Sequence, residues 1–389
     1  MLESPQIYET TIKYFLQPVW DLIEDETVSE ILINGPDQVY AERKGRLGKL
    51  DRHFSSSEKL MAAVKNIAQF SGKRIDPYTN ELEARLPDGS RVHVVFPPCA
   101  RQGISVSIRK FSRNKFTMDT LIANGSMTEP AREFLDLLTL IGKNIIVSGG
   151  TGSGKTSLLN AISAAIPSKE RVIVIEDSCE LQLQQEHVLN FEVRKPDHKG
   201  RGASTIRDLF KSSLRMRPDR IVIGEIRGGE ALDMLQAMNS GHSGSMSTVH
   251  ANTPRDALSR LETLALMGGV DIPLHALRNQ VASAIDIVVQ TSRMLDGSRK
   301  ITNISEVLPL TPEGNYVMQD IFTFRSSGCD ENGKLIGELN WTGRVSEAAD
   351  ELQSKGYVSL VVMTNAVFGL PWDHKMAEPL LQAGQVNHA

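Results

Sequence analysis

Residues 143–166 constrain the fold of this chain more than any other stretch, because an apolar run, a glycine-rich turn and a helical pattern follow one another. The turn reads GGTGSGKT from Gly149 to Thr156. This is the GxxxxGK[ST] pattern in a strand, turn and helix context, which argues against an ordinary glycine-rich loop. Glycines let backbone N–H groups converge on one anion, and the positive end of the helix points at the same place. The stretch therefore predicts a loop that binds the phosphates of a nucleoside triphosphate.

The residues of this phosphate loop divide the binding between backbone and side chains. Lys155 would bridge the outer phosphates, and the Thr156 hydroxyl would bind Mg²⁺. The other expected contacts come from backbone N–H groups of the turn and of the first helical turn. The expected nucleotide-binding residues of this stretch are Gly149, Gly150, Thr151, Gly152, Ser153, Gly154, Lys155, Thr156 and Ser157.

Composition limits the class of protein and its partners. The 43 Lys and Arg residues against 47 Asp and Glu, a net charge of −4, give no support for nucleic acid as the main partner. The 3 cysteines are isolated, which indicates a reducing compartment and no disulfide partners. No apolar stretch reaches the roughly 18 residues of a membrane span, and the N-terminus does not read as a secretory signal. We expect a cytoplasmic protein that does not insert into a membrane and reaches one only through partners.

The first part of the chain reads as an α+β domain. We expect strands at 28–34, 38–42, 83–86, 91–96 and 104–109, and a helix at 57–70. Its informative feature is arginine on or beside the strands, at Arg85, Arg91, Arg101 and Arg109. The pattern alone leaves two interpretations open, a solvent-exposed strand face and a face that contacts a ligand.

The second part alternates strands and helices, which is typical of an α/β fold. A helix should end at Gly142, just before the phosphate loop strand. We expect further strands at 171–175, 220–223, 245–249 and 285–290, and helices at 204–216, 228–239, 254–266 and 273–284. Near the C-terminus, 337–343 is strand-like and 346–355 helical. The apolar cluster at 357–372 favours a last element packed on the core over a docking patch for a membrane-embedded partner.

Acidic residues follow two of these strands. Glu176 and Asp177 end the strand at 171–175, and Glu225 follows the strand at 220–223. In a parallel sheet both strand ends reach the edge that carries the phosphate loop. Gly224 stands where P-loop ATPases usually place an aspartate, so Glu225 is better suited to polarise water than to hold Mg²⁺. Glu176 and Asp177 are then candidates for the outer shell of the metal.

Two further features allow more than one interpretation. His250 ends the strand at 245–249 and could be structural, or could sense the γ-phosphate through an imidazole hydrogen bond. Residues 194–220 form a basic tract that could bind nucleic acid. Its helix is amphipathic and aromatic residues are nearly absent, so a solvated face or a subunit interface is favoured.

The order of these motifs resembles the secretion traffic ATPases, the hexameric motors of type II secretion, type IV pili and type IV secretion. The resemblance rests on GGTGSGKT, VIVIEDSCELQLQQ, RMRPDRIVIGEIRGGEALDMLQAMNSGH and STVHANTPRDALSRLETL, and it covers residues 28–345. Within this family the chain is similar to the tight-adherence (Flp) pilus assembly ATPases. That similarity rests on INGPDQVYAERKGRL, RLPDGSRVH, ISVSIRKF and QDIFTF.

The resemblance implies an architecture for the whole chain. A RecA-like P-loop motor domain at 128–326 would follow a smaller α+β (PAS-like) N-terminal domain at 1–111 and a flexible linker at 112–127. Residues 327–389 would form a C-terminal extension, and the tail after about 356 matches no part of the family. The long N-terminal extension of the tight-adherence branch is missing or short here, which leaves recruitment through it in doubt. The family also implies a homohexamer that uses ATP and Mg²⁺ and works with inner-membrane pilus platform proteins.

The resemblance also assigns roles to individual residues. Glu225 would be the Walker B glutamate, Glu176 and Glu180 the acids of the Asp box, and His250 the histidine of the His box. The expected catalytic residues are Glu225, Glu176, Lys155, His250, Arg91 and Arg109. Beyond the phosphate loop, the expected nucleotide-binding residues are Arg85, Asp177, Glu180 and Arg227, and the expected metal-binding residues are Thr156 and Glu176.

These expectations combine into one functional hypothesis. ATP binding would close the N-terminal domain onto the motor domain and bring Arg91 and Arg109 to the γ-phosphate. Repeated hydrolysis would drive assembly, or assembly and retraction, of a tight-adherence pilus from the cytoplasmic side of the inner membrane. The alternative within the motor class is a conjugation or type IV secretion ATPase. Alternatives from other classes are a nucleic-acid translocase and a P-loop kinase.

Overall fold

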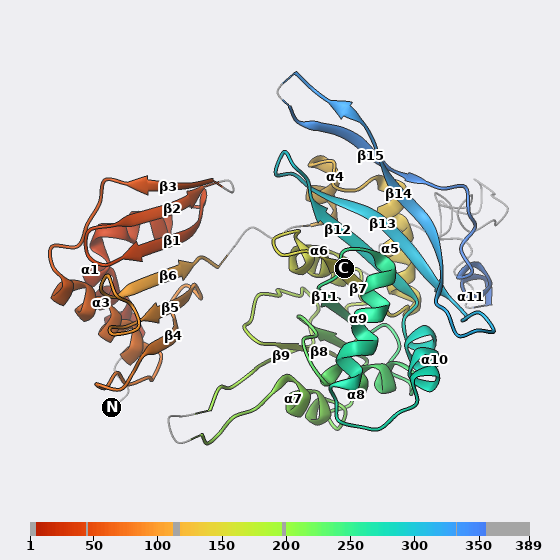
Figure 1. The fold of residues 1–389 in the computed structure, drawn as a ribbon, viewed down its shortest axis with the longest axis horizontal. Helices are drawn as coiled ribbons and strands as arrows, with labels where there is room; N and C mark the ends of the chain where they lie inside the picture. Colours follow the sequence, from red (N-terminus) through yellow and green to blue (C-terminus); the bar gives the residue numbers. More distant parts are fainter. Residues whose placement is uncertain (1–4, 44–45, 112–116, 197–199, 332, 355–389) are drawn as a thin grey trace. The chain divides into compact units, whose positions relative to one another are not determined.

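The computed structural model describes residues 5–354, apart from 44–45, 112–116, 197–199 and 332. The chain divides into two units, Met1–Asn114 and Lys115–Ala389 (Figure 1). Among the described residues, no helix is long and apolar enough to cross a membrane. The apolar cluster predicted at 357–372 lies outside the described residues.

The first unit is built on a six-stranded antiparallel sheet in the order β3-β2-β1-β6-β5-β4. Its strands are β1 (Val28–Asn34), β2 (Val39–Arg43), β3 (Arg46–Leu50), β4 (Glu81–Arg85), β5 (Arg91–Val95) and β6 (Ser105–Arg109). Its helices are α1 (Pro5–Phe15), the 3-10 helix η1 (Gln17–Val19), α2 (Trp20–Glu24) and α3 (Ser57–Phe70). Alternate residues of β4, β5 and β6 are buried, so one face of the sheet joins the helices in a core and the other carries polar side chains. The helix predicted at 57–70 is confirmed.

The second unit contains a nine-stranded sheet in the order β15-β14-β13-β12-β7-β11-β10-β8-β9. The strands are β7 (Ile145–Gly149), β8 (Val172–Glu176), β9 (Val188–Glu192), β10 (Arg220–Ile223), β11 (Met246–Val249), β12 (Ile287–Arg293), β13 (Arg299–Leu308), β14 (Val317–Cys329) and β15 (Leu335–Trp341). The strands from β12 to β9 run parallel, and β13, β14 and β15 extend the sheet antiparallel. Strand β7 lies between β12 and β11, so the phosphate loop leaves the sheet near its middle.

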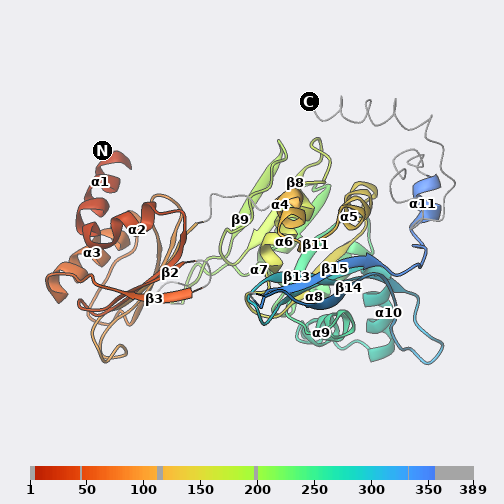
Figure 2. The same cartoon turned by 90° about the horizontal axis from the view of Figure 1, so that it is seen from above.

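Helices cover both faces of this second sheet (Figure 2). Helices α5 (Glu129–Ile141) and α6 (Lys155–Ser163) contribute to the core on one face. Helices α7 (Ile206–Ser213), α8 (Glu230–Met238), α9 (Pro254–Leu266) and α10 (Leu274–Ala284) share the core on the other. Strands β7, β8, β10 and β11 are buried throughout, because both faces are covered. The predicted α/β fold class is confirmed.

Several predictions of chain organisation need correction. Helix α4 (Met118–Ala123) lies inside the predicted linker, and Met118 and Met127 are buried in the core of the second unit. The predicted C-terminal extension begins at 327, which is inside β14, and β15 pairs with that strand. The extension up to Trp341 is therefore part of the sheet. Helix α11 (Ala349–Ser354) follows it, within the stretch predicted to be helical.

Strands β9, β13 and β14 were not among the predicted elements. The outer strand β9 is only partly buried and is five residues long, so its apolar pattern is weak. The connection between β12 and β13 does carry a signal, the pair Asp296-Gly297 between two apolar stretches, which is typical of a hairpin. The predicted α/β alternation ended at β12, so these antiparallel strands were missed.

Candidate nucleotide-binding site

The phosphate loop joins the buried strand β7 to helix α6. Gly154, the residue before the helix, has φ 96° and ψ 21°, a left-handed conformation that favours glycine. A Cβ on Gly149 would lie 2.3 Å from the carbonyl oxygen of Thr291 and 2.5 Å from Ser153 Oγ. Gly150, Thr151 and Gly152 form the exposed tip, and Thr156 and Ser157 lie in the first turn of α6. The predicted strand, loop and helix therefore have the shape that holds an anion at the start of α6.

Lys155 is held at the mouth of this loop. Its side chain is buried, and Nζ donates to the carbonyl oxygens of Gly149 at 3.1 Å and Gly150 at 3.0 Å. Nζ also lies 3.3 Å from Nδ1 of His250. Burial lowers the pKa of Lys155, while the carboxylate of Glu225 acts in the opposite direction. The lysine therefore connects the phosphate loop to the ends of the neighbouring strands.

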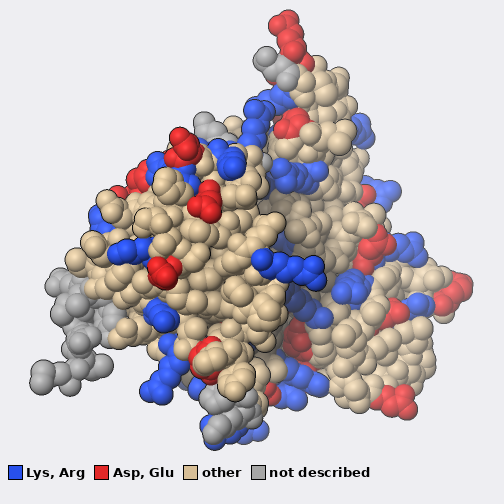
Figure 3. All heavy atoms as spheres, turned by 60° about the vertical axis from the view of Figure 1, so that its left-hand side comes forward, with Lys and Arg blue, Asp and Glu red and all other residues tan. Residues whose placement is uncertain are grey.

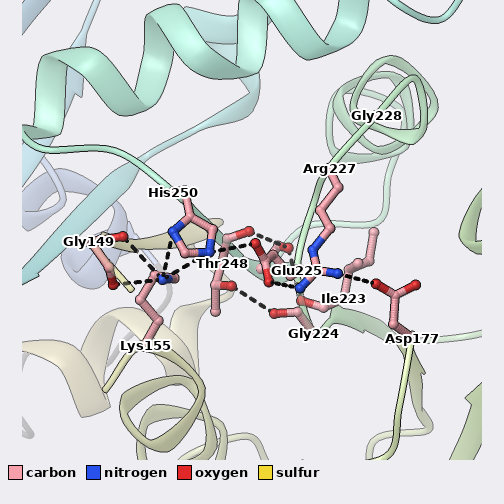
Figure 4. Close-up of polar contacts among 12 residues, drawn as sticks. Gly149, Lys155, Asp177, Ile223, Gly224, Glu225, Arg227, Gly228, Thr248 and His250 are labelled. Carbon is pink, nitrogen blue, oxygen red and sulfur yellow. Dashed lines mark hydrogen bonds and ion pairs between the residues drawn. The ribbon is translucent and has the colours of Figure 1, made fainter. Parts of the chain in front are cut away.

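A continuous chain of polar contacts leads from Lys155 to Asp177 (Figure 4). His250 Nε2 is 2.9 Å from Glu225 Oε1. The other Glu225 oxygen accepts from Arg227 at 2.7 Å, and Arg227 donates to Asp177 at 2.9 Å. Burial and then the charge of Lys155 lower the pKa of His250. The ring is therefore neutral near pH 7, and its Nε2–H can donate to Glu225 while Nδ1 accepts from Lys155.

These residues come together because they follow parallel strands. Glu225 and Arg227 follow β10, His250 follows β11 and Asp177 follows β8. The ends of β10 and β11 are tied, since Thr248 Oγ1 donates to the Gly224 carbonyl at 2.8 Å and the Thr248 carbonyl accepts from the Ile226 N–H at 3.0 Å. The sheet thus brings Lys155, Asp177, Glu225, Arg227 and His250 to one edge, as ligand sites of open α/β sheets require.

Glu176 also lies at the end of a strand, but its side chain is buried, unlike those of Asp177, Arg227 and His250. Its side chain is 3% exposed, and Oε1 accepts the backbone N–H groups of Glu180 at 3.0 Å and Leu181 at 3.1 Å. Burial raises the pKa of Glu176 to about 7. The carboxyl group anchors the loop after β8 in this structure. Within the part of the chain that the structure describes, no group of three or more His, Cys, Asp or Glu side chains is arranged to hold a metal. The metal-binding role of Glu176 therefore stays a prediction.

The glycine at position 224 has a steric explanation. A Cβ at Gly224 would lie 2.9 Å from Cγ of Glu176. Because the Glu176 carboxyl is tied to two backbone N–H groups, its side chain has little freedom to move away. The space that an aspartate would need at position 224 is thus taken by Glu176.

This contact makes a stability prediction for Gly224→Ala. We expect the free energy of unfolding of the second unit to fall by about 1–3 kcal/mol, the range for overpacking a buried position. Denaturant unfolding without nucleotide would measure it. Gly150→Ala is the matched control, because its Cβ would meet nothing within 4 Å. Equal midpoints for the two variants would show that Glu176 adjusts freely.

The structure adds site residues that sequence reasoning missed. Thr291 Oγ1 donates to the Ser153 carbonyl at 2.9 Å, and Arg299 Nε donates to the Gly152 carbonyl at 2.9 Å. Gln290 contacts the Ser148 hydroxyl and donates to the Ala251 carbonyl at 3.2 Å. All belong to the β12–β13 hairpin, so the Asp296-Gly297 turn motif could have drawn attention to them.

The predicted arginines of the first unit lie in one row across its sheet. Arg85 is the register partner of Arg91, and Arg91 is the register partner of Arg109. Arg91 forms an ion pair with Glu83, and Arg85 donates to the Gly89 carbonyl at 3.2 Å. The row is on the face away from the core, where Arg85 and Arg91 are partly exposed and Arg109 is exposed. Arg101 lies in the turn before β6, outside the row.

The basic tract is less uniform than its sequence suggests. Arg207 pairs with Asp233 at 2.5 Å, and Arg220 is buried against Glu170. Residues 197–199 of the tract lie outside the described part. On the face drawn in Figure 3, most of the surface is neither basic nor acidic, and acidic side chains lie among the basic ones. This mixture agrees with the net charge of −4 and does not resemble the basic stripe of nucleic-acid-binding proteins.

The comparison with protein families decides the class of this chain. Residues 15–346 match the family model described as "Type II/IV secretion system protein". The chain belongs to this family. The predicted resemblance to secretion traffic ATPases is thereby confirmed at the level of the family. Family membership, the phosphate loop and the acids at the same sheet edge together identify the chain as an ATPase.

Individual relatives support the same family. PtlH of Bordetella pertussis, a type IV secretion system protein, is 36% identical over an alignment of 311 residues that covers 73% of this chain and 91% of PtlH. VirB11 of Bartonella henselae (strain ATCC 49882 / Houston 1), also a type IV secretion system protein, is 34% identical over 328 residues, covering 74% of this chain and 91% of VirB11. The crystal structure of the pilus retraction motor PilT with bound ADP has a TM-score of 0.52 at 16% identity, and covers 95% of this chain and 96% of PilT. That likeness confirms the fold, an N-terminal domain followed by a RecA-like core.

Proposed function

We propose that this secretion-family ATPase is the motor that drives assembly of a tight-adherence type IV pilus. The observation that carries the motor part is the contact chain from Lys155 through His250 and Glu225 to Arg227. In this chain a cation, an imidazole and a carboxylate lie beside one phosphate loop. Phosphoryl transfer to water requires little more than such positioned groups and a metal ion.

The residues present fit ATP and Mg²⁺. The left-handed Gly154 shapes an anion cradle at the start of α6, and Gly149 lies too close to Thr291 and Ser153 for any Cβ. Lys155 would bind the β- and γ-phosphates in place of the loop carbonyls that it now contacts. Thr156 would hold Mg²⁺, which supplies charge neutralisation when bound, with Glu176 as the predicted acid of its outer shell.

In this proposal Glu225 polarises the attacking water. Its two oxygens are already oriented by His250 at 2.9 Å and Arg227 at 2.7 Å, so little reorganisation is needed when the water arrives. His250 contacts both Lys155 and Glu225. A change in the position of Lys155 when phosphate binds can therefore alter the hydrogen bond between His250 and Glu225. Asp177 fixes the far end of Arg227.

The arginine row of the first unit would complete the site. We infer that ATP binding closes the N-terminal domain onto the motor domain and brings Arg91 and Arg109 to the γ-phosphate, with Arg85 as a third candidate. Their shared register supports this, because a row of guanidinium groups across one face of the sheet suits a polyanion. The ATPase would act as a homohexamer in which the arginines work within one subunit or between neighbours.

For Arg109→Ala we expect the turnover number to fall about tenfold to a hundredfold, because guanidinium groups stabilise charge that develops on the transferred phosphoryl group. The free energy of unfolding should stay within about 0.5 kcal/mol of the wild-type value, as for most surface substitutions. A coupled ATPase assay and thermal unfolding would measure both. Arg46→Ala, on the outer strand β3 of the same sheet, is the control. Equal turnover in the two variants would return Arg109 to the solvent-exposed interpretation.

The choice of a tight-adherence pilus rests on the sequence motifs INGPDQVYAERKGRL, RLPDGSRVH and ISVSIRKF. The motor would work on the cytoplasmic face of the inner membrane, attached through pilus platform proteins. The second candidate is type IV secretion or conjugation, which is favoured by the names of the relatives PtlH and VirB11.

A chromosomal Glu225→Gln allele in the source organism would separate the two candidates. Loss of surface pili with unchanged conjugation and protein secretion would support the pilus motor. Intact pili with lost transfer would favour the second candidate. In vitro, hydrolysis that rises with the hexamer fraction and is unaffected by added DNA or RNA would exclude a nucleic-acid translocase. Release of inorganic phosphate without a phosphorylated acceptor would exclude a kinase.

A further inference from the structure

The β12–β13 hairpin holds the outer side of the phosphate loop. Arg299, the first residue of β13, donates through Nε to the Gly152 carbonyl at 2.9 Å. Thr291 of β12 donates through Oγ1 to the next carbonyl of the loop, that of Ser153, at 2.9 Å. The Cδ atom of Arg299 would be 3.2 Å from a Cβ placed on Gly154. The hairpin thus contacts three consecutive residues of the phosphate loop, Gly152, Ser153 and Gly154.

These contacts orient the N–H groups of the loop. In a trans peptide the carbonyl and the N–H point in opposite directions. A donor that holds the Ser153 carbonyl on the outside of the loop therefore aims the Gly154 N–H towards the inside, where an anion is bound. Arg299 fixes the preceding peptide, whose Ser153 N–H donates to the Gly150 carbonyl at 3.3 Å and closes the turn of the loop. A charged donor holds a carbonyl more strongly than a neutral one.

The other side of the same hairpin holds the turn after helix α4. Lys300 is 4% exposed, and its Nζ donates to the Gly125 carbonyl at 2.6 Å and to the Asn124 carbonyl at 3.5 Å. The Ser126 hydroxyl donates to the Arg299 carbonyl at 2.7 Å, and the Ile301 N–H donates to the Ser126 carbonyl at 3.1 Å. These carbonyls belong to the C-cap residue of α4 and to the residue after it, where a cation is favourable.

Arg299 and Lys300 therefore face two different segments from adjacent positions of one strand. Side chains of successive strand residues point to opposite faces of a sheet, which is how one strand reaches both the loop tip and the turn at 124–126. Helix α4 is the first element of the second unit, directly after the stretch that joins the two units. A displacement of α4 would therefore move Lys300, and with it the neighbouring residue Arg299.

We propose that Arg299 is a positioning residue for ATP hydrolysis, which keeps the phosphate loop in its binding shape and links it, with Lys300, to the turn after α4. The link runs in both directions, because a coupling between two sites is reciprocal. Nucleotide bound in the loop stabilises the turn at 124–126, and movement of that turn changes the affinity for nucleotide. This inference concerns the ATPase core and does not depend on which secretion or pilus machine the motor serves.

Steady-state kinetics of Arg299→Ala in the full chain test the positioning role. We expect the KM for ATP to rise about tenfold, with a smaller change in kcat, because one charge-assisted hydrogen bond to the binding loop is lost while Glu225 is untouched. Arg293→Ala is the matched control. Arg293 is exposed on the same hairpin and is the register partner of Arg299. An unchanged KM in Arg299→Ala, or equal changes in both variants, would overturn the positioning role.

Hydrogen exchange tests the link to α4. In the wild type, saturating ADP should slow amide exchange in a peptide covering 118–126. The slowing should be lost in Arg299→Ala and in Lys300→Met, and kept in Arg293→Ala. A wild type without nucleotide-dependent protection at 118–126, or an Arg299→Ala variant that retains it, would overturn the link. If the Lys300→Met variant does not fold, the comparison of Arg299→Ala with Arg293→Ala decides the result.

Discussion

Lys155→Ala is expected to reduce ATP turnover by about a thousandfold or more. Losses of this size follow when a group that stabilises the charge of the transition state is removed. The substitution removes the buried cation that the loop carbonyls and His250 surround. Nucleotide binding should weaken at the same time, since Lys155 is the only lysine within the loop itself. Equilibrium binding of a fluorescent ATP analogue and a coupled hydrolysis assay would measure the two effects.

Lys169→Ala provides the control for this substitution. Lys169 is exposed, on the stretch between α6 and β8. Its variant should bind and hydrolyse ATP as the wild type does. If Lys155→Ala kept more than about a tenth of wild-type turnover, a span of about 1.4 kcal/mol in barrier height, the phosphate loop would not be the catalytic centre.

Glu225→Gln should separate binding from chemistry. The amide keeps the size of the carboxylate and can still accept from Arg227, so ATP affinity should change by less than about threefold, or about 0.6 kcal/mol. Turnover should fall by about a hundredfold to ten-thousandfold, the usual contribution of a group that accepts a proton from the attacking water. Single-turnover hydrolysis with preformed enzyme–ATP complex would measure the chemical step directly.

Glu186→Gln is the companion variant, because Glu186 is an exposed glutamate of the same unit. Retained turnover in Glu225→Gln would move the role of water activation to another acid. Asp177 would then be the next candidate, since Arg227 already connects it to the same site at 2.9 Å. Loss of ATP binding would indicate instead that the charge of Glu225 is needed to balance Lys155 and Arg227.

The sequence predicted the parts of this site that depend on strand ends. Glu225 and His250 follow the buried strands β10 and β11, and parallel strands bring such residues to one edge whatever the details of packing. The helix at 57–70 and the strand at 220–223 were predicted to the residue for a similar reason, because their apolar periodicity and their end signals agree.

The parts that could not be predicted depend on contacts between distant segments. Arg299 touches Gly152 across 147 positions of sequence, and no local pattern encodes that meeting. Glu176 was expected near the metal, yet its burial and its contacts with the following loop emerge only from the packing around β8. The sequence shows Gly224 at a position where an aspartate is usual, but the steric reason for the glycine needs the position of the Glu176 side chain.

Helix α4 could not be predicted for a local reason. Its six residues at 118–123 are too few for an apolar periodicity to show. Thr117 caps it through a hydrogen bond from the Thr120 N–H at 3.2 Å, a local signal that the polar surroundings obscure. Burial of Met118 in the motor core then decides that the helix belongs with the second unit.

The aligned arginines of the first unit imply a trade-off between folding and activity. Like charges directly opposite each other on neighbouring strands destabilise a sheet, by about 0.2–1 kcal/mol for each pair. Arg91 and Arg109 are such neighbours, and Glu83 offsets part of the repulsion at Arg91. On its other side Arg109 has Glu30 of β1 as its register partner, which offsets part of the repulsion there as well. The repulsion that remains lowers the stability of the sheet. A polyanion that neutralised the row would remove this repulsion. Part of its binding free energy would therefore come from the loss of repulsion between the arginines of the sheet.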